Sequence, residues 1–352
     1  MGWCTTPDLE EFLTEAGGYL SSKAAENTLL LSAVQAARAG RPARSQADPI
    51  GPLYGWWQPP DGGGPRGAFV HDPALPLLIS GRVPEMAATL AAVLAKMGRP
   101  VSGVDAPTEA ADAFAAAWSQ RAGTAVRVQR QCRVYRIVRP SRQGGGWPQS
   151  EVPGPAGRLR VAQPEDQALL ADWLSASAAE ATERLDSPFD VAADLISYGG
   201  AIFWEVPEGP SRRVAHYLAG QHHRDGQFGE PAQQPVALVT LTRPVAGTIR
   251  ISRLYTPPEE RRGGYAAAIT MAASHAILAG VLRSAPGRIN EVIVITDRNR
   301  SDRGGRFGYE LVDEREVLRF GPVTGPLPHP PRTGPTPRLP TGPLPRIPRL
   351  RR

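Results

Sequence analysis

The segment 248–266 combines residue types that could bind an anion. An alternating strand pattern runs into a double proline, and Gly263 and Gly264 then precede an alanine-rich helical pattern. Free backbone N–H groups converge at such a helix start, and the helix dipole adds about half a positive charge there. Glycine lets a phosphate approach the backbone without a Cβ in the way, and Arg261 and Arg262 add cationic side chains. The sequence therefore predicts an anion site at this turn.

The turn lacks the two common nucleotide-binding motifs. A P-loop needs Gly-Lys followed by Ser or Thr, and a dinucleotide fingerprint needs three spaced glycines; the segment has neither. Taken alone, the glycine pair also fits an ordinary helix start without a ligand. In the following helix, Tyr265, Ile269, Ala272 and Ala276 recur at spacings of four, three and four residues. This period, with small residues between, predicts close packing on a sheet.

Composition divides the chain into four parts. Residues 1–140 and 158–320 have the patterns of folded units, and 141–157 is a linker rich in proline and glycine. Residues 321–352 hold 11 prolines and repeat a Thr-Gly-Pro motif. A segment with so little apolar surface is expected to be a disordered tail with local polyproline II character.

The two folded units repeat one order of elements: helices, then three strands, a helix, a strand and further elements ending in a strand. The first unit is predicted to hold helices at 8–23, 24–40, 84–97 and 108–121 and strands at 53–57, 67–71, 75–80, 101–104 and 125–138. The second is predicted to hold helices at 164–184 and 264–281 and strands at 200–205, 236–242, 248–255, 291–296 and within 307–320. This repetition predicts an α/β fold with a mixed sheet, made by duplication of one unit.

The basic charge of the chain is concentrated in its tail. The formal net charge is +6, and residues 321–352 carry six arginines and no acid. Without them the chain holds 34 basic and 34 acidic residues. A neutral body offers no basic face, so we expect no nucleic-acid partner.

Targeting features are weak throughout the sequence. Two cysteines, Cys4 and Cys132, are too few for a disulfide framework and fit a reducing compartment. The first residues have no signal-peptide pattern, and no apolar run is long enough to span a bilayer. We therefore expect a cytoplasmic protein without a membrane partner.

The segment Tyr-Thr-Pro-Pro-Glu-Glu-Arg-Arg-Gly-Gly-Tyr-Ala resembles the acyl-CoA pyrophosphate loop of the GNAT (GCN5-related) superfamily of N-acetyltransferases. The family pattern falls on Arg261, Gly264 and Ala266. Downstream, 292–299 resembles the next family strand, and 306–312 resembles the strand that follows the last family helix. The resemblance covers roughly 159–320, and the first half looks like a degenerate copy whose loop at 79–85 lacks the glycine pattern.

The resemblance implies tandem GNAT-like units, of which the second binds acetyl-CoA as co-substrate. The implied coenzyme-binding residues are Leu254, Tyr255, Thr256, Arg261, Arg262, Gly263, Gly264, Tyr265, Ala266, Asp297 and Asn299. The pyrophosphate would bind the loop backbone and the pantetheine would pair with the strand near Tyr255. A primary amine would then attack the thioester directly, with a backbone N–H stabilising the oxyanion.

Two departures from the family bear on catalysis. The loop reads Arg-Arg-Gly-Gly where the family has Arg-Gly-Arg-Gly, which backbone contacts tolerate. The stretch 296–309 is shorter than usual, so the tyrosine that often protonates the leaving thiolate would fall at Gly304, which has no hydroxyl. General-acid help is typically worth about 10²- to 10⁴-fold, although a thiolate leaves tolerably without it.

The remaining candidates concern the base and a metal. Glu205, at the end of its strand, is the candidate base, with a solvated strand-end carboxylate as the alternative. Tyr255 is the second catalytic candidate, with packing beside the coenzyme as its alternative. The insertion 206–234 holds three of the six histidines but no cysteine, so we expect no metal site there and interpret it as a lid or mobile loop.

The sequence thus predicts an acyl-CoA-dependent N-acyltransferase acting on a primary amine, with acetyl as the donor group and a small-molecule acceptor, as a monomer or homodimer. The alternative is a catalytically silent module of the same fold that binds acyl-CoA or serves as a scaffold. The intact 261–266 loop favours the enzyme, and the missing tyrosine at Gly304 favours the silent module.

Overall fold

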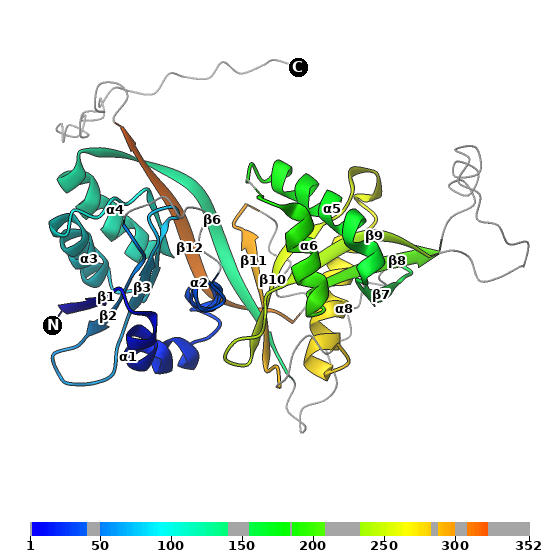
Figure 1. Cartoon of the computed structure of the whole chain (residues 1–352), viewed down its shortest axis with the longest axis horizontal. Coiled ribbons are helices and arrows are strands. Elements are labelled where there is room, and N and C mark those ends of the chain that lie inside the picture. The colour runs from blue at the N-terminus through cyan, green and yellow to red at the C-terminus, as the bar shows by residue number, and fades with distance from the viewer. Residues whose placement is uncertain are drawn as a thin grey trace, which may run out of the picture.

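The computed structural model describes residues 2–40, 50–139, 155–183, 185–207, 233–282, 288–299 and 308–322. Most of the predicted linker, the 206–234 insertion and the tail, together with Gly304, lie outside these residues. The described residues form one mixed sheet with helices on both faces (Figure 1). The predicted α/β class with a mixed sheet is confirmed.

The sheet has twelve described strands in the order β1-β2-β3-β4-β5-β12-β6-β11-β10-β9-β8-β7. Their bounds are β1 Gly2–Thr6, β2 Leu53–Gln58, β3 Ala68–His71, β4 Leu77–Ser80, β5 Gly103–Pro107, β6 Thr124–Val138, β7 Arg158–Val161, β8 Ala201–Pro207, β9 Gln233–Leu241, β10 Thr248–Tyr255, β11 Glu291–Asp297 and β12 Glu310–Pro322. Pairs β4–β5 and β10–β11 are parallel, and the other pairs are antiparallel.

The helices of the two units are arranged similarly, except that α4 of the first unit has no counterpart among the described residues of the second. The first unit has α1 Leu9–Ser22, α2 Thr28–Arg38, α3 Pro84–Lys96 and α4 Thr108–Ala122. The second has η1 Pro164–Asp166, α5 Gln167–Glu180, α6 Pro188–Ser197, η2 Pro258–Glu260 and α8 Tyr265–Ala279. The helix predicted over 164–184 is therefore too long at both ends, because a capping box around Gln163 starts η1 first and the α-helix ends at Glu180.

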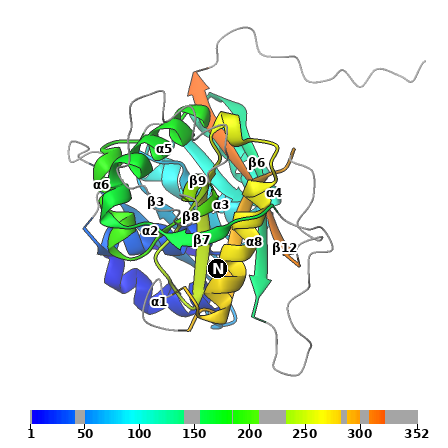
Figure 2. The same ribbon diagram turned by 90° about the vertical axis from the view of Figure 1, so that its right-hand side faces the viewer.

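Strand alternation places separate cores on the two faces of the sheet. In β8, Ile202 and Trp204 pack with α8, whereas Phe203 between them packs with α5 and α6. Figure 2 shows α8 on one side of the strands and α5 and α6 on the other. In β3, Phe69 packs with α3 and α4, and Val70 packs with α1 and α2. Each unit is thus a sheet between two helical layers.

The two units exchange their last strands. Strand β6 ends the first unit but pairs along all seven residues of β11 in the second, from Val138 opposite Glu291 to Cys132 opposite Asp297. Strand β12 ends the second unit but pairs with β5 of the first. The exchanged strands also pair with each other, which makes the sheet continuous at the centre of the molecule (Figure 1).

Candidate active site in the second unit

The parallel strands β10 and β11 separate before they end. Their pairing runs from Thr248 opposite Glu291 to Ile251 opposite Val294 and then stops, although β10 continues for four residues. On its other side, β10 has a bulge between Ile251 and Arg253 in its pairing with β9. A bulge bends its strand and increases its twist, so it accounts for the separation. We call the gap beyond Ile251 the C-terminal wedge.

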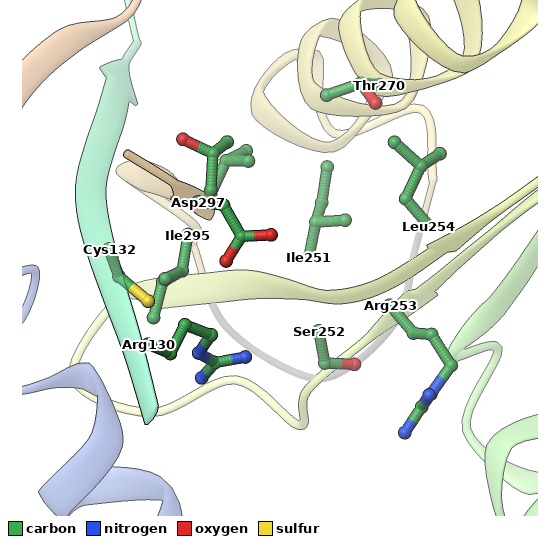
Figure 3. Close-up of a pocket in the computed structure, with 11 residues that line it drawn as sticks. Arg130, Cys132, Ile251, Ser252, Arg253, Leu254, Thr270, Ile295 and Asp297 are labelled. Atoms are coloured by element: carbon green, nitrogen blue, oxygen red, sulfur yellow. The ribbon is translucent and has the colours of Figure 1, made fainter. Parts of the chain in front are cut away.

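The C-terminal wedge contains a cavity of about 190 Å³ (Figure 3). Its described lining residues are Arg130, Cys132, Ile251, Ser252, Arg253, Leu254, Thr270, Val294, Ile295, Thr296 and Asp297. They come from β10, β11, α8 and the exchanged strand β6. Beyond the paired residues, backbone groups that would bond across a parallel pair face this gap instead, and an extended ligand could use them.

Helix α8 begins next to the wedge with the geometry of an anion site. Gly264 is its N-cap residue, with φ +80°, and no side chain caps the helix. The first N–H groups of a helix have no partner within it, so here they are available to a ligand. A Cβ on Gly264 would meet nothing closer than Pro155 Cδ at 3.6 Å. No acid lies in the first turn of α8, so no side chain of that turn offsets the positive end of the dipole.

The 261–264 loop is exposed and is held by two contacts of Arg261. The Arg261 Nε donates to the Thr256 carbonyl oxygen at 3.0 Å, and its Nη2 forms an ion pair with Glu180 of α5. Arg262 has φ +69° and is exposed. The predicted loop residues, from Arg261 to Ala266, are thus together at one helix start. Because Arg261 closes the loop onto Thr256, Arg262 is the cation of this loop that has no partner among the described residues.

The predicted strand-end residues also lie at the wedge. Leu254 lines the cavity, and Tyr255 packs its ring against Trp173 with centroids 5.7 Å apart. Burial raises the Tyr255 pKa, so its hydroxyl is a poor acid at neutral pH. Asp297 lines the opposite wall, and Asn299 lies in the exposed turn that follows it.

Glu205 lies away from the wedge. It is on β8, two strands from β10, and its buried carboxylate accepts from Arg160 Nε at 2.5 Å and from Arg158 Nε at 3.3 Å. Arg160 also holds Asp166 through two hydrogen bonds. These ion pairs explain a buried carboxylate without any catalytic role. The alternative of a solvated strand-end carboxylate is wrong, because Glu205 is buried, and its role as the base stays a prediction.

Tyr309 precedes β12 and packs beneath α8. Its hydroxyl is hydrogen-bonded to the Ser274 hydroxyl at 2.6 Å, and burial raises its pKa to about 12. Such a group is a weak proton donor at neutral pH. The described residues of the wedge therefore offer no tyrosine with an acidity suited to the leaving thiolate.

Sequence reasoning missed three features of the site. The bulge at Ser252 carries a signal, since the polar pair Ser252-Arg253 interrupts the alternation of Ile249 and Ile251. Arg130 and Cys132 have no such signal in the sequence, because they reach the wedge only through the exchange of β6.

No cluster of His, Cys, Asp or Glu able to hold a metal occurs among the described residues, and no described helix could span a membrane.

The corresponding wedge of the first unit is filled. Strands β4 and β5 pair only at Leu77 opposite Val104 and Leu78 opposite Asp105. Beyond them lies the guanidinium of Arg315 from β12, which is 2% exposed. It donates to the carbonyl oxygens of Asp105 at 2.9 Å and Ile79 at 3.3 Å, and to the Asp105 carboxylate at 2.9 Å. We call this gap the N-terminal wedge.

No family model matches the sequence, and no curated protein matches it. Solved structures do resemble the chain. One is a GCN5-related N-acetyltransferase from Sphaerobacter thermophilus (13% identity, 90% of this chain and 95% of that one, TM-score 0.48). Another is a tandem GNAT protein from the clavulanic acid biosynthesis pathway (12%, 91% and 98%, TM-score 0.46). A third is a GNAT-family acetyltransferase from Colwellia psychrerythraea (9%, 91% and 99%, TM-score 0.43). These structures bear the name of the family that residues 249–309 resemble, but such low identities and TM-scores imply nothing about activity.

Proposed function

We propose that the protein is an acyl-CoA-dependent N-acyltransferase whose coenzyme occupies the C-terminal wedge. One observation carries the proposal: a parallel strand pair opens at a bulge directly beside an uncapped, glycine-led helix start. An acyl-CoA has an extended pantetheine arm and a pyrophosphate, and the two parts of the site match these two parts of the ligand. Acetyl is the proposed acyl group.

Different residues would bind different parts of the coenzyme. The first-turn N–H groups of α8, with Gly264 leaving room, would hold the pyrophosphate, and Arg262 would add charge at its rim. Backbone groups of β10 from Ser252 to Leu254 would pair with the pantetheine amides. One backbone N–H of the same stretch would stabilise the oxyanion, because it is fixed in a strand before reaction.

The proposed reaction transfers the acyl group from the coenzyme sulfur to an amine nitrogen. The nitrogen of a neutral primary amine attacks the thioester carbonyl, the C–N bond forms, and the C–S bond breaks to release the thiolate. The proton lost from the amine nitrogen must leave the site, and Glu205 remains only a prediction for that base. The proposed acceptor is a small molecule.

A second candidate is a coenzyme-binding protein without turnover. It is favoured by the surroundings of two candidate groups: Glu205 lies away from the wedge and is held by two arginines, and Tyr309 is bonded to Ser274. In either case we propose a cytoplasmic monomer or homodimer that uses neither metal nor nucleic acid.

The test is calorimetric titration of acetyl-CoA into the full chain and into two variants. Gly264→Asp puts a carboxylate at the proposed pyrophosphate site and should weaken binding on the order of 100-fold, because juxtaposed like charges cost several kcal/mol. Gly280→Asp is the matched control. Gly280 has φ +77° at the other end of α8, so its variant has the same backbone strain and charge but should bind acetyl-CoA normally.

Binding lost only in Gly264→Asp supports the site. Equal affinity in both variants would contradict it. Release of thiol on adding a primary amine then separates the enzyme from the silent binding protein.

A further inference from the structure

One wall of the cavity is supplied by the first unit. The last residue of β11, Asp297, pairs with Cys132 of β6, and the following Arg298 N–H donates to the Gln131 carbonyl oxygen at 2.9 Å. Arg130 comes immediately before these residues on β6. It therefore lies beyond the end of β11 and faces β10 across the open wedge, where it lines the cavity.

Arg130 is exposed, and its charge has no counter-ion among the described residues. Two other arginines of β6 are paired: Arg133 Nε donates to Glu314 at 2.9 Å, and Arg136 Nε donates to Glu310 at 3.0 Å. By contrast, no hydrogen bond or ion pair joins the Arg130 guanidinium to any of the described residues. Figure 3 shows Arg130 and Arg253 extending on the same side of β10, with Ser252 between them. Arg253 is already bonded to Glu183 at 3.0 Å.

A third guanidinium increases the positive potential behind this wall. Arg250 of β10 has a buried Nε without a hydrogen-bond partner, and its Nη2 reaches Ser32 of α2 at 3.3 Å. Burial lowers its pKa to about 10, and the charge of Arg130 contributes in the same direction. The Asp105 carboxylate acts in the opposite direction and raises the Arg250 pKa more than Arg130 lowers it, so Arg250 remains protonated at neutral pH.

The cavity also holds one acid among its described lining residues. Asp297 lies at the end of β11, and its carboxylate is not within ion-pair distance of Arg130. The wedge thus presents a cationic wall from β6 and a separate carboxylate from β11. An acceptor with an ammonium and an acidic group in one small molecule complements both.

We propose that Arg130 determines the acceptor class: a small primary amine that also bears an anionic group, a carboxylate or a phosphate, which the guanidinium binds. This inference rests on the proposed acyltransfer in the C-terminal wedge. It deepens that proposal, because it assigns acceptor recognition in the second unit to a residue of the first. The planar guanidinium suits both anions, since each can accept two parallel N–H bonds.

The experiment measures thiol release from acetyl-CoA by the full chain with a panel of amines. Glycine, glutamate and 2-aminoethyl phosphate each carry an anionic group besides the amine. Ethanolamine has no anionic group, and spermidine carries several positive charges. We expect kcat/KM for the preferred anionic amine to exceed that for ethanolamine by about 10- to 100-fold, the range typical of a hydrogen-bonded ion pair. The carboxylate and phosphate members show which anion is used.

Variants of β6 assign the effect to Arg130. Arg130→Ala should lose the preference for anionic amines by raising their KM, and Arg130→Glu should favour spermidine. The matched control is Arg127→Ala. Arg127 is an exposed arginine on the same strand that does not line the cavity, so its variant should keep the wild-type preference.

The outcomes separate this inference from the proposed function. If the chain binds acetyl-CoA but prefers neutral amines, if Arg130→Ala slows all amines equally, or if no anionic amine reacts, the acceptor assignment is overturned while the coenzyme site stands. If acetyl-CoA does not bind, the proposed function itself fails. A preference for an anionic amine that Arg130→Ala removes and Arg127→Ala keeps supports the inference.

Discussion

The two wedges have the same strand topology, but the N-terminal wedge is filled by a side chain and the C-terminal wedge is open. In each unit a parallel strand pair separates, and the strand donated by the other unit runs alongside: β12 beside β5, and β6 beside β11. At the residue opposite the end of the parallel strand, β12 has Arg315, facing Pro107, and β6 has Cys132, facing Asp297. The long arginine fills the N-terminal wedge, whereas the short cysteine leaves the C-terminal wedge open.

The helices beside the two wedges also start differently, and only the start of α8, beside the open wedge, suits an anion. Helix α3 has Pro84 in its first turn, followed by Glu85, so one N–H is missing and an acid occupies the positive end of the dipole. Helix α8 has Gly264 before it and no acid. In both units the parallel strands separate in the same way. The side chains around the gap determine whether it can bind a ligand or becomes part of the core.

Removing Arg315 should have the largest effect on the protein. Arg315→Met keeps the bulk but leaves the Asp105 carboxylate buried without its cation, whereas Asp313 keeps its ion pair with Arg82. Removing one partner of a buried ion pair typically costs about 3–5 kcal/mol. We expect that loss in the free energy of unfolding, measured by urea denaturation. Arg319→Met on the same strand is the control, since Arg319 is bonded to the exposed Gln129 at 2.7 Å and should cost less than about 1 kcal/mol.

A small loss for Arg315→Met, equal to that of the control, would show that the N-terminal wedge is not held closed by this residue. The larger loss would establish it as a structural plug.

Lengthening Cys132 should have a smaller and more local effect. Cys132→Met puts a longer side chain at the position that Arg315 occupies in the other wedge, so it narrows the cavity. We expect the Kd of acetyl-CoA to rise about tenfold, which corresponds to roughly 1.4 kcal/mol, because the longer side chain takes up space that the ligand needs. Titration calorimetry measures this change. Cys4→Met is the control, since Cys4 is exposed on β1, and its affinity should match the wild type.

If Cys132→Met binds acetyl-CoA as well as the wild type does, side-chain length at this position does not distinguish the two wedges. The difference would then lie in the helix starts alone.

The local elements of the fold could be predicted from the sequence. Hydrophobic period and turn residues located α3, α8, β6 and β10 to within a few residues, and the glycine turn located the candidate site. Short edge strands were missed: β1 and β7 have five and four residues, too few for a clear alternation. They also precede helices, so no hairpin turn marks them.

The long-range features could not be predicted. Strand exchange joins β6 to β11 across more than 150 residues, and no periodic pattern records which partner a strand has. Arg130, Cys132 and Arg315 therefore look like ordinary strand residues in the sequence. Their roles depend on where the exchanged strands end. For the same reason, the predicted domain limits at 140 and 158 divide the sequence but not the sheet, which continues from one unit into the other.

The most direct test of the account is the stoichiometry of acetyl-CoA binding to the full chain, measured by titration calorimetry. One open and one filled wedge predict one coenzyme per chain, and predict that Arg262→Glu, at the rim of the proposed pyrophosphate site, weakens that single event. Two equivalents per chain, or one equivalent that is indifferent to Arg262→Glu, would contradict the assignment of the coenzyme to the C-terminal wedge.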